Sequence, residues 1–367
     1  MQQLLLSIKA LTASEIWGNV WPYLLALLLF ALLVSIHEFG HFFVAKLCGI
    51  KVNEFALGFG PKLFSFGKKE TKYSLRLIPF GGFCAMEGED EESTDGRAYC
   101  NKPVYKRIAV CAAGAINNLI LGFLLFVLLL CLSGAFGTTV VANFNEGATS
   151  CLEGGLQAED KIKEIDGRKI FCHRDISYML INSEDTVVDI TVERDGKEIE
   201  LKNVSFPSQE IEGKRYISLD FKVYGVKVSW GNALQVIKVA ALETFSAARL
   251  VWMTLIDMIG GRYGLNEMMG PVGTISAVGE AAKANLSSLV YMMAIITVNL
   301  GVFNLIPFPA LDGGRILLLA VEGVTRKKIP EKYESWIHAA GLMLLLLLML
   351  VVGANDIKRL ITGRWNL

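Results

Sequence analysis

The chain has 367 residues, a length that accommodates two or three domains. Hydrophobic residues make up 53% of it and gather in long blocks, which excludes an ordinary soluble protein and indicates an integral membrane protein. The formal net charge is zero, so the charge balance does not favour a nucleic-acid partner, and we expect none.

Four apolar blocks, each long enough with its flanks to cross a hydrocarbon layer of about 30 Å, predict four transmembrane helices. They comprise residues 21–33, 119–132, 288–310 and 338–354. The expected fold is therefore a polytopic α-helical membrane protein embedded in a lipid bilayer. Residues 1–137 and 227–367 are expected to form the N-terminal and C-terminal parts of its membrane core.

The distribution of basic residues predicts the orientation of these helices. Lys and Arg concentrate in residues 46–106, between the first two spans, and in residues 315–332, between the last two. By the positive-inside rule both loops face the cytoplasm, which puts residues 138–285 and both termini outside. Lys358, Arg359 and Arg364 in the tail argue mildly for the opposite orientation.

Residues 52–83 predict a membrane-associated β-hairpin or small sheet, because two alternating apolar runs flank the polar stretch "GKKETK". The segment is rich in glycine and has apolar faces, which is unusual for a solvated loop. A sheet that dips into the membrane, with its backbone shielded by protein, accounts for that composition. The alternating residues are Phe55, Leu57 and Phe59, then Tyr73, Leu75 and Leu77.

Residues 138–226 change character and predict an inserted α+β domain. Strand-like runs alternate with turns, and Asp195-Gly196 joins two of them. The stretch "GGLQAEDKIKEIDG" resembles the signature of PDZ domains, which bind extended peptides at a sheet edge. A spacer domain without a ligand is the alternative. Cys151 and Cys172 lie in this domain and could pair.

Residues 233–259 follow a helical pattern in which charged residues interrupt apolar positions on several faces. That mixture favours a helix lying on the membrane surface over a spanning one. A fifth span is the alternative, and an odd number of spans would reverse the topology of everything after it. The interrupting residues are Lys238, Glu243, Arg249 and Asp257.

The first predicted span contains His37-Glu38-Phe39-Gly40-His41, an H-E-x-x-H motif. Residues four apart share one helix face, so both imidazoles can reach one metal ion, and Glu38 is placed to take a proton from bound water. Ionisable residues within a membrane span are costly unless they are functional. The alternative, two histidines hydrogen-bonded within a helix bundle, leaves Glu38 paired with a basic residue.

A catalytic zinc site usually has three protein ligands, and Asp312 is the best third candidate. It lies in "VNLGVFNLIPFPALDGG", where prolines stop the helix and glycines allow a tight turn. His173 and His338 are poorer candidates, since one lies in the inserted domain and the other lies outside any motif. The alternative for Asp312 is a cap on the following helix.

With H-E-x-x-H in the first span, "NLIPFPALDGG" near the end and a PDZ-like insert between them, the sequence resembles the bacterial site-2 protease family. The resemblance covers residues 21–357 and includes "GFGPKLF", "IPFGGF" and "NEMMGPVG" in the same order. It implies a zinc metalloendopeptidase of regulated intramembrane proteolysis. It also implies a multi-pass protein of the bacterial inner membrane, with the active site near the cytoplasmic side and the PDZ-like domain outside.

The same resemblance assigns roles to individual residues. His37, His41 and Asp312 are implied to bind zinc, and Glu38 to activate the water. Asn304 matches a position that holds substrate or steadies the oxyanion. A further family motif, Gly-x-x-x-Asn, maps to Gly114 and Asn118, and Asn118 is implied as a second residue that contacts substrate or the oxyanion. Ala115 replaces the usual proline and Asn117 adds a second amide, so the role of this motif is left open.

The implied substrates are single-span membrane proteins, such as anti-sigma factors or remnant signal peptides, already trimmed by a site-1 protease. An edge strand within residues 52–83 could pair with the unwound substrate, and we expect residues 73–77 to form that edge.

Two other classes of protein remain as alternatives. A catalytically silent scaffold has no need for Glu38 together with three metal ligands, and a metal transporter should carry further ligands across the membrane.

Overall fold

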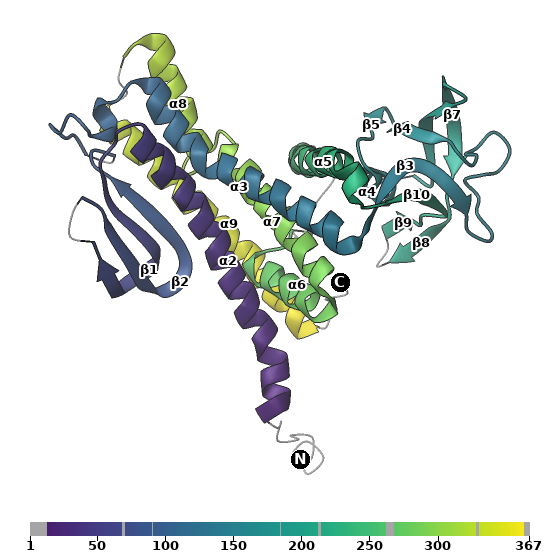
Figure 1. Cartoon of the computed structure of the whole chain (residues 1–367), viewed down its shortest axis with the longest axis horizontal. Helices are drawn as coiled ribbons and strands as arrows, with labels where there is room; N and C mark the ends of the chain where they lie inside the picture. The colour runs from purple at the N-terminus through teal and green to yellow at the C-terminus, as the bar shows by residue number, and fades with distance from the viewer. Residues whose placement is uncertain are drawn as a thin grey trace. The chain divides into compact units, whose positions relative to one another are not determined.

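The computed structural model describes residues 13–67, 70–89, 91–183, 185–211, 214–261, 268–327 and 330–362. It divides into two units, and Figure 1 shows the helices and strands of both. Met1–Gly122 and Val251–Leu367 form the first unit, which holds most of the membrane helices. Phe123–Leu250 form the second, which holds the inserted domain.

Within the described residues, five helices are long and apolar enough to cross a membrane. They are α2 (Ala13–Leu47), α3 (Val104–Ser133), α5 (Ala233–Ile259), α7 (Leu286–Leu305) and α9 (Glu331–Thr362). Four contain the predicted spans, although α7 ends before the predicted boundary at residue 310, because Pro307 and Pro309 cannot continue its hydrogen bonding. The fifth is α5, so the predicted count of four depends on its lying on the membrane surface, which stays a prediction.

Small residues bring α3 close to both α2 and α7. A Cβ atom added at Gly40 of α2 would lie 2.5 Å from the carbonyl oxygen of Ala113. A Cβ atom added at Gly301 of α7 would lie 2.9 Å from the carbonyl oxygen of Ala115. Such close approach is typical of membrane helices, whose association depends on van der Waals packing rather than on the hydrophobic effect.

Helix α6 (Pro271–Ala284) begins within the "GPVG" stretch and is anchored to α9 by a buried carboxylate. Asp356 of α9 is fully buried, and its two oxygens accept the backbone N–H groups of Gly270 and Gly273 at 3.2 and 2.9 Å. A carboxylate at a helix N-terminus satisfies unpaired N–H groups and interacts favourably with the helix dipole. This intramembrane acid therefore has a structural role in holding α6.

The sheet that we expect to associate with the membrane consists of β1 (Val52–Phe66) and β2 (Lys72–Met86), which contact α2 (Figure 1). Each strand bends, so the sheet has four paired segments. Residues 52–57 lie between residues 82–86 on one side and residues 72–75 on the other. Residues 73–76 also pair with residues 62–66 on their other side. The two edges of the sheet are thus residues 62–66 and 82–86. The expectation that residues 73–77 form an edge is wrong, because Tyr73, Ser74 and Leu75 are paired on both sides.

The part of the sheet formed by residues 57–66 and 75–78 exposes many large apolar side chains. They are Leu57, Phe59, Leu63, Phe64, Phe66, Leu75, Leu77 and Ile78. Beside them, Glu54 is paired with Arg76 and Lys62 at 2.9 and 3.1 Å. Burial opposes ionisation of Glu54, but hydrogen bonds from Ser74, Arg76 and Lys62 outweigh it and lower its pKa to about 2. The exposed apolar surface favours the expected immersion of this end of the sheet in lipid.

The second unit contains a five-strand antiparallel path in the order β10-β3-β4-β6-β7, with β5 paired to β4 and a separate hairpin β8–β9. Asp195 and Gly196 both have positive φ between β6 and β7, as their predicted hairpin turn requires. The elements are β3 (Ala135–Phe144), β4 (Lys161–Ile165), β5 (Arg168–Lys169), α4 (His173–Ile181), β6 (Val187–Arg194), β7 (Lys197–Ser205), β8 (Ser208–Ile211), β9 (Lys214–Ile217) and β10 (Phe221–Lys227). The α+β class is as expected, and the PDZ assignment stays a prediction.

Polar side chains of α5 contact α4 within this second unit. Glu243 lies 3.2 Å from Arg174, and Arg249 lies 3.1 Å from Asp175. Two of the charges that interrupt the apolar pattern of α5 are therefore accounted for by protein contacts. Cys151 is an exposed free thiol and Cys172 a buried one, so they are not paired.

The close contact of α2 with α3 predicts different outcomes for two glycines of the same helix. Gly40→Ala should lower the melting temperature in detergent, since a methyl group forced against the Ala113 carbonyl costs about 1–3 kcal/mol. Gly18→Ala is the control, because no atom lies within 4 Å of a Cβ added there and alanine favours the helix. Equal melting temperatures for the two variants would contradict the close contact.

Candidate metal centre

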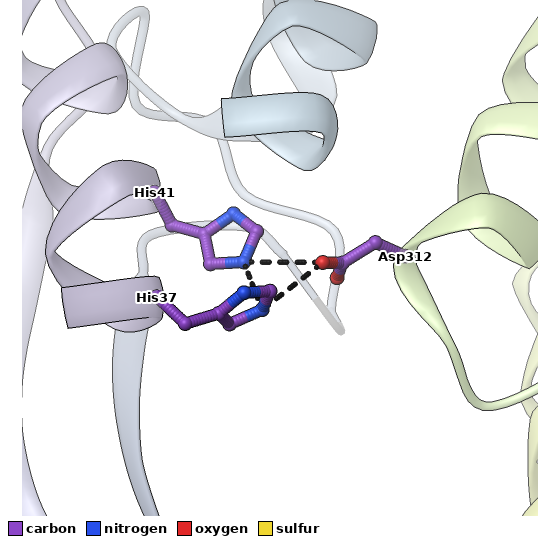
Figure 2. Close-up of side chains that lie close together, drawn as sticks. All are labelled: His37, His41 and Asp312. Carbon is purple, nitrogen blue, oxygen red and sulfur yellow. Dashed lines mark hydrogen bonds and ion pairs between the residues drawn. The ribbon is translucent and has the colours of Figure 1, made fainter. Parts of the chain in front are cut away.

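His37 and His41 lie one turn apart on α2, as the H-E-x-x-H spacing predicts. Their Nε2 atoms are 3.2 Å apart, and the two residues are only 6% and 9% exposed. Both rings present Nε2 to the same point (Figure 2). Their Nδ1 atoms contact residues of α3. The helix periodicity therefore supplies two converging nitrogen ligands.

Asp312 completes the group from α8 (Asp312–Thr325). Its Oδ2 atom lies 3.2 Å from Nε2 of His37 and 3.4 Å from Nε2 of His41 (Figure 2). These three residues are the one group of potential metal ligands found in the described part of the chain. The predicted third ligand is thus brought to the two histidines.

The spacing of the three atoms fits zinc. Ligands held about 2.0–2.1 Å from a tetrahedral zinc ion are separated by about 3.3 Å along each tetrahedron edge. The three observed separations, 3.2, 3.2 and 3.4 Å, match one face of such a tetrahedron. Oδ2 of Asp312 is also buried without a hydrogen-bond partner in the described structure, so a cation would satisfy it. Two neutral imidazoles and a carboxylate are a donor set that zinc accepts, with a fourth position left for water.

The turn between α7 and α8 directs Asp312 towards the histidines. Ala310 has a φ of 73°, and its N–H donates to Nδ1 of His338 on α9 at 3.0 Å. A Cβ at Gly313 or Gly314 would collide with backbone carbonyls of residues 305–308, so only glycine permits this tight return. Asp312 does not cap the following helix, which was the alternative role. The N-cap residue is Leu311, which makes no side-chain cap hydrogen bond, and the Asp312 carboxylate faces the imidazoles.

The Nδ1 atoms of both histidines have partners on α3. Nδ1 of His41 lies 2.8 Å from the carbonyl oxygen of Val110, and Nδ1 of His37 lies 3.2 Å from the amide of fully buried Asn118. An imidazole that binds zinc through Nε2 carries its proton on Nδ1, which then donates a hydrogen bond. For His41 the acceptor is the Val110 carbonyl.

For His37 the same requirement selects the orientation of the Asn118 amide. Oδ1 of Asn118 is buried without a partner when its nitrogen faces the ring. Because the two ends of an amide group are nearly identical in shape, turning it over places Oδ1 against the Nδ1–H of His37. This orientation satisfies the orphaned oxygen and leaves Nε2 free for the metal.

Gly114 makes room for the imidazoles. A Cβ atom there would lie 2.8 Å from Nε2 of His37 and would collide with Nε2 of His41. Gly114 therefore clears the space for the ligands, and Asn118, one turn further along α3, reaches His37. This explains both positions of the Gly-x-x-x-Asn motif, whose role the sequence leaves open. Ala115, where the family usually has proline, is fully buried against Gly301.

Glu38 lines a cavity of about 390 Å³ together with the three potential ligands. Edge segment 82–86 of the sheet forms another wall of this cavity through its last four residues. Where that segment begins, a Cβ added at Gly82 would lie 3.4 Å from Cγ of Glu38. The lining residues are His37, Glu38, His41, Phe83, Cys84, Ala85, Met86, Glu89, Val110, Cys111, Asp312 and Arg315.

Asn304 does not line this cavity. It lies half-buried in the last turn of α7, and its predicted role in holding substrate or the oxyanion stays a prediction. Asn117, the second amide of the motif, donates to the carbonyl oxygen of Ile36 at 2.5 Å. Sequence patterns do not single out Val110, Glu89 or Arg315 for this site, because their importance depends on contacts between distant segments.

Comparison with known proteins identifies the class to which this fold and site belong. The model of peptidase family M50 matches residues 25–348, and the chain belongs to that family, which comprises the site-2 proteases. It is accordingly a zinc metalloprotease of the membrane.

Individual relatives match along nearly their whole length. A Clostridium perfringens protein whose name assigns it to the zinc metalloproteases is 39% identical over 333 residues, 90% of this chain and 97% of the relative. The zinc metalloprotease RasP of Geobacillus kaustophilus is 30% identical over 91% of this chain and 97% of its own. The regulator of sigma-W protease RasP of Bacillus subtilis is 29% identical over the same shares.

Asn118→Ala should lower zinc affinity about 10–100-fold, because loss of the partner at Nδ1 releases the His37 ring. Asn118→Asp should retain zinc, since a carboxylate also accepts the Nδ1–H. Asn117→Ala is the matched control and should bind zinc as the wild type does. Zinc titration of the purified proteins checks all three. Strong binding by Asn118→Ala, or loss of zinc by Asn118→Asp, would contradict the orientation of the Asn118 amide.

Proposed function

We propose that this protein is an intramembrane endopeptidase that cleaves transmembrane segments of single-span membrane proteins. The observation that carries the proposal is the meeting of His37, His41 and Asp312 with Glu38 in one cavity, with both histidines and Glu38 on a membrane helix. The name of the Bacillus subtilis relative, a regulator of sigma-W protease, supports substrates such as anti-sigma factors. Remnant signal peptides are a second substrate of the same chemical kind.

The chemistry follows from the residues of the cavity. His37, His41 and Asp312 would hold zinc, which when bound makes water a nucleophile near neutral pH and polarises a carbonyl group. Glu38 accepts the proton of the attacking water and then delivers it to the leaving amine of the cleaved peptide. Val110 and Asn118 keep the two imidazoles in the tautomer that the metal requires.

A transmembrane substrate must unwind before its carbonyl can be attacked, and its exposed backbone then needs partners in a nearly dry site. Segment 82–86 can supply them, because it is paired on one side only in the described sheet and lines the cavity. The substrate would add to the sheet as a further strand. This places the substrate-binding edge at residues 82–86 rather than at residues 73–77.

The remaining expectations concern orientation and access. The basic loops favour an active site near the cytoplasmic side of the bacterial inner membrane, with the PDZ-like domain outside. That domain would exclude substrates that a site-1 protease has not yet trimmed, by peptide binding or by size. Asn304 would contact the substrate or its oxyanion. For Asn118 we now favour the positioning of His37 over contact with the oxyanion, because its amide is fully buried against that ring.

Purified wild type should cleave a tagged single-span substrate in detergent, and Glu38→Gln should reduce the rate by at least about 10²-fold, since the proton acceptor is lost. Zinc content separates the roles: Glu38→Gln should keep its zinc and Asp312→Ala should lose it. Equal cleavage by wild type and Glu38→Gln would sink the proposal.

Proline scanning tests the substrate-binding edge. Successive N–H groups of a strand point to opposite sides, so either Cys84→Pro or Ala85→Pro removes an N–H that faces the open edge. At least that variant should lose cleavage while keeping its zinc. Leu63→Pro, on the other edge of the same sheet, is the control and should cleave normally. If both proline variants at residues 84 and 85 fold and cleave as the wild type does, strand addition at this edge is excluded.

A further inference from the structure

An ion pair connects the substrate-binding edge to the helix that carries the third metal ligand. Oε1 of Glu89 accepts a hydrogen bond from Nη1 of Arg315, and Oε2 of Glu89 accepts the N–H of Met86 at 3.3 Å. Glu89 thus contacts the last residue of segment 82–86 and a side chain of α8 at once. Arg315 follows Asp312 by three residues, so the two side chains lie on the same side of α8.

The pair also lies between two cavities. Glu89 and Arg315 both line the cavity that holds the potential metal ligands, and both line a polar cavity of about 330 Å³ beside it. The second cavity includes another ion pair, Arg107 of α3 with Glu322 of α8 at 2.5 Å. That pair joins α8 to α3, and its hydrogen bond does not involve segment 82–86.

Segment 82–86 is therefore fixed at both ends relative to the catalytic groups. Its first residue, Gly82, lies beside Glu38, so that an added Cβ would reach contact distance, and its last residue, Met86, is tied through Glu89 to Arg315. We propose that Glu89 and Arg315 are positioning residues, which hold this edge at a fixed distance and register from the metal ligand Asp312 and so select the peptide bond that is cut. This inference rests on the proposed function, since it concerns the substrate bound at that edge.

The physical reason is the period of a strand. A substrate strand that slips by two residues keeps the same side chains facing the cavity, whereas a slip of one residue turns every side chain to the other face. When the edge is fixed, only one of the substrate registers that differ by two residues places a peptide carbonyl at the metal. An edge released from α8 can shift along its own axis, and neighbouring registers then become productive.

The test uses the full-length protein with a tagged single-span substrate, and mass spectrometry of the products locates each cut. Arg315→Gln and Glu89→Gln should each lower kcat/KM about tenfold, the effect expected for loss of one charge-assisted contact. New cuts should appear two residues away from the wild-type bond. Zinc content and melting temperature should stay near those of the wild type.

Arg107→Gln is the matched control, because it removes another Arg–Glu ion pair to the same helix without touching the edge, and it should keep the single cut. A single, unshifted product from Arg315→Gln at the wild-type kcat/KM would overturn the inference. Loss of zinc from Arg315→Gln would overturn it as well, since the residue would then support the metal rather than the substrate. Failure of the proposed function is distinguishable, because Glu38→Gln would then cleave as fast as the wild type.

Discussion

Three polar ligand atoms must converge within the core of a membrane protein, and the surrounding residues lower the free-energy cost of burying them. An imidazole or carboxylate without a partner is costly away from water, so each needs a fixed neighbour. Val110 and Asn118 occupy the outer nitrogens of the two histidines, and Gly114 leaves the space in which the inner nitrogens meet Asp312. The α7–α8 turn brings in the carboxylate, and its N–H at Ala310 is bound by a residue of α9.

Features that depend on neighbours in sequence were predictable. The helix period fixes His37 and His41 on one face, whatever surrounds them, and Asp195-Gly196 has the backbone preferences of a tight hairpin turn. Apolar length identifies the spans in the same way, because it reflects only the thickness of the bilayer. Asp312 is an intermediate case, since proline and glycine predict an irregular turn, but its link to the histidines came only from the weakness of the other candidate ligands, His173 and His338.

Features that depend on pairing between distant segments were not predictable. The sheet was expected as a hairpin, but bends in both strands place residues 52–57 between two segments of β2, which moves the free edge from 73–77 to 82–86. The role of Asn118 depends on the rotation of α3 against α2, and alternation of residue types does not encode that rotation. For α5, composition alone could not show that Glu243 and Arg249 meet charged partners in the inserted domain.

The glycine contacts of α3 have a consequence for how a substrate reaches the site. Where a backbone carbonyl lies against Gly40 or Gly301, there is no side chain whose rotation could widen the gap, so separation would require whole helices to part. The α2–α3–α7 wall therefore behaves as a rigid frame. Under the proposed function, a transmembrane substrate would therefore enter past segment 82–86, which lines the cavity and is held to α8 by the Glu89–Arg315 ion pair. The positions of Gly40 and Gly301 thus restrict the direction from which a substrate would enter.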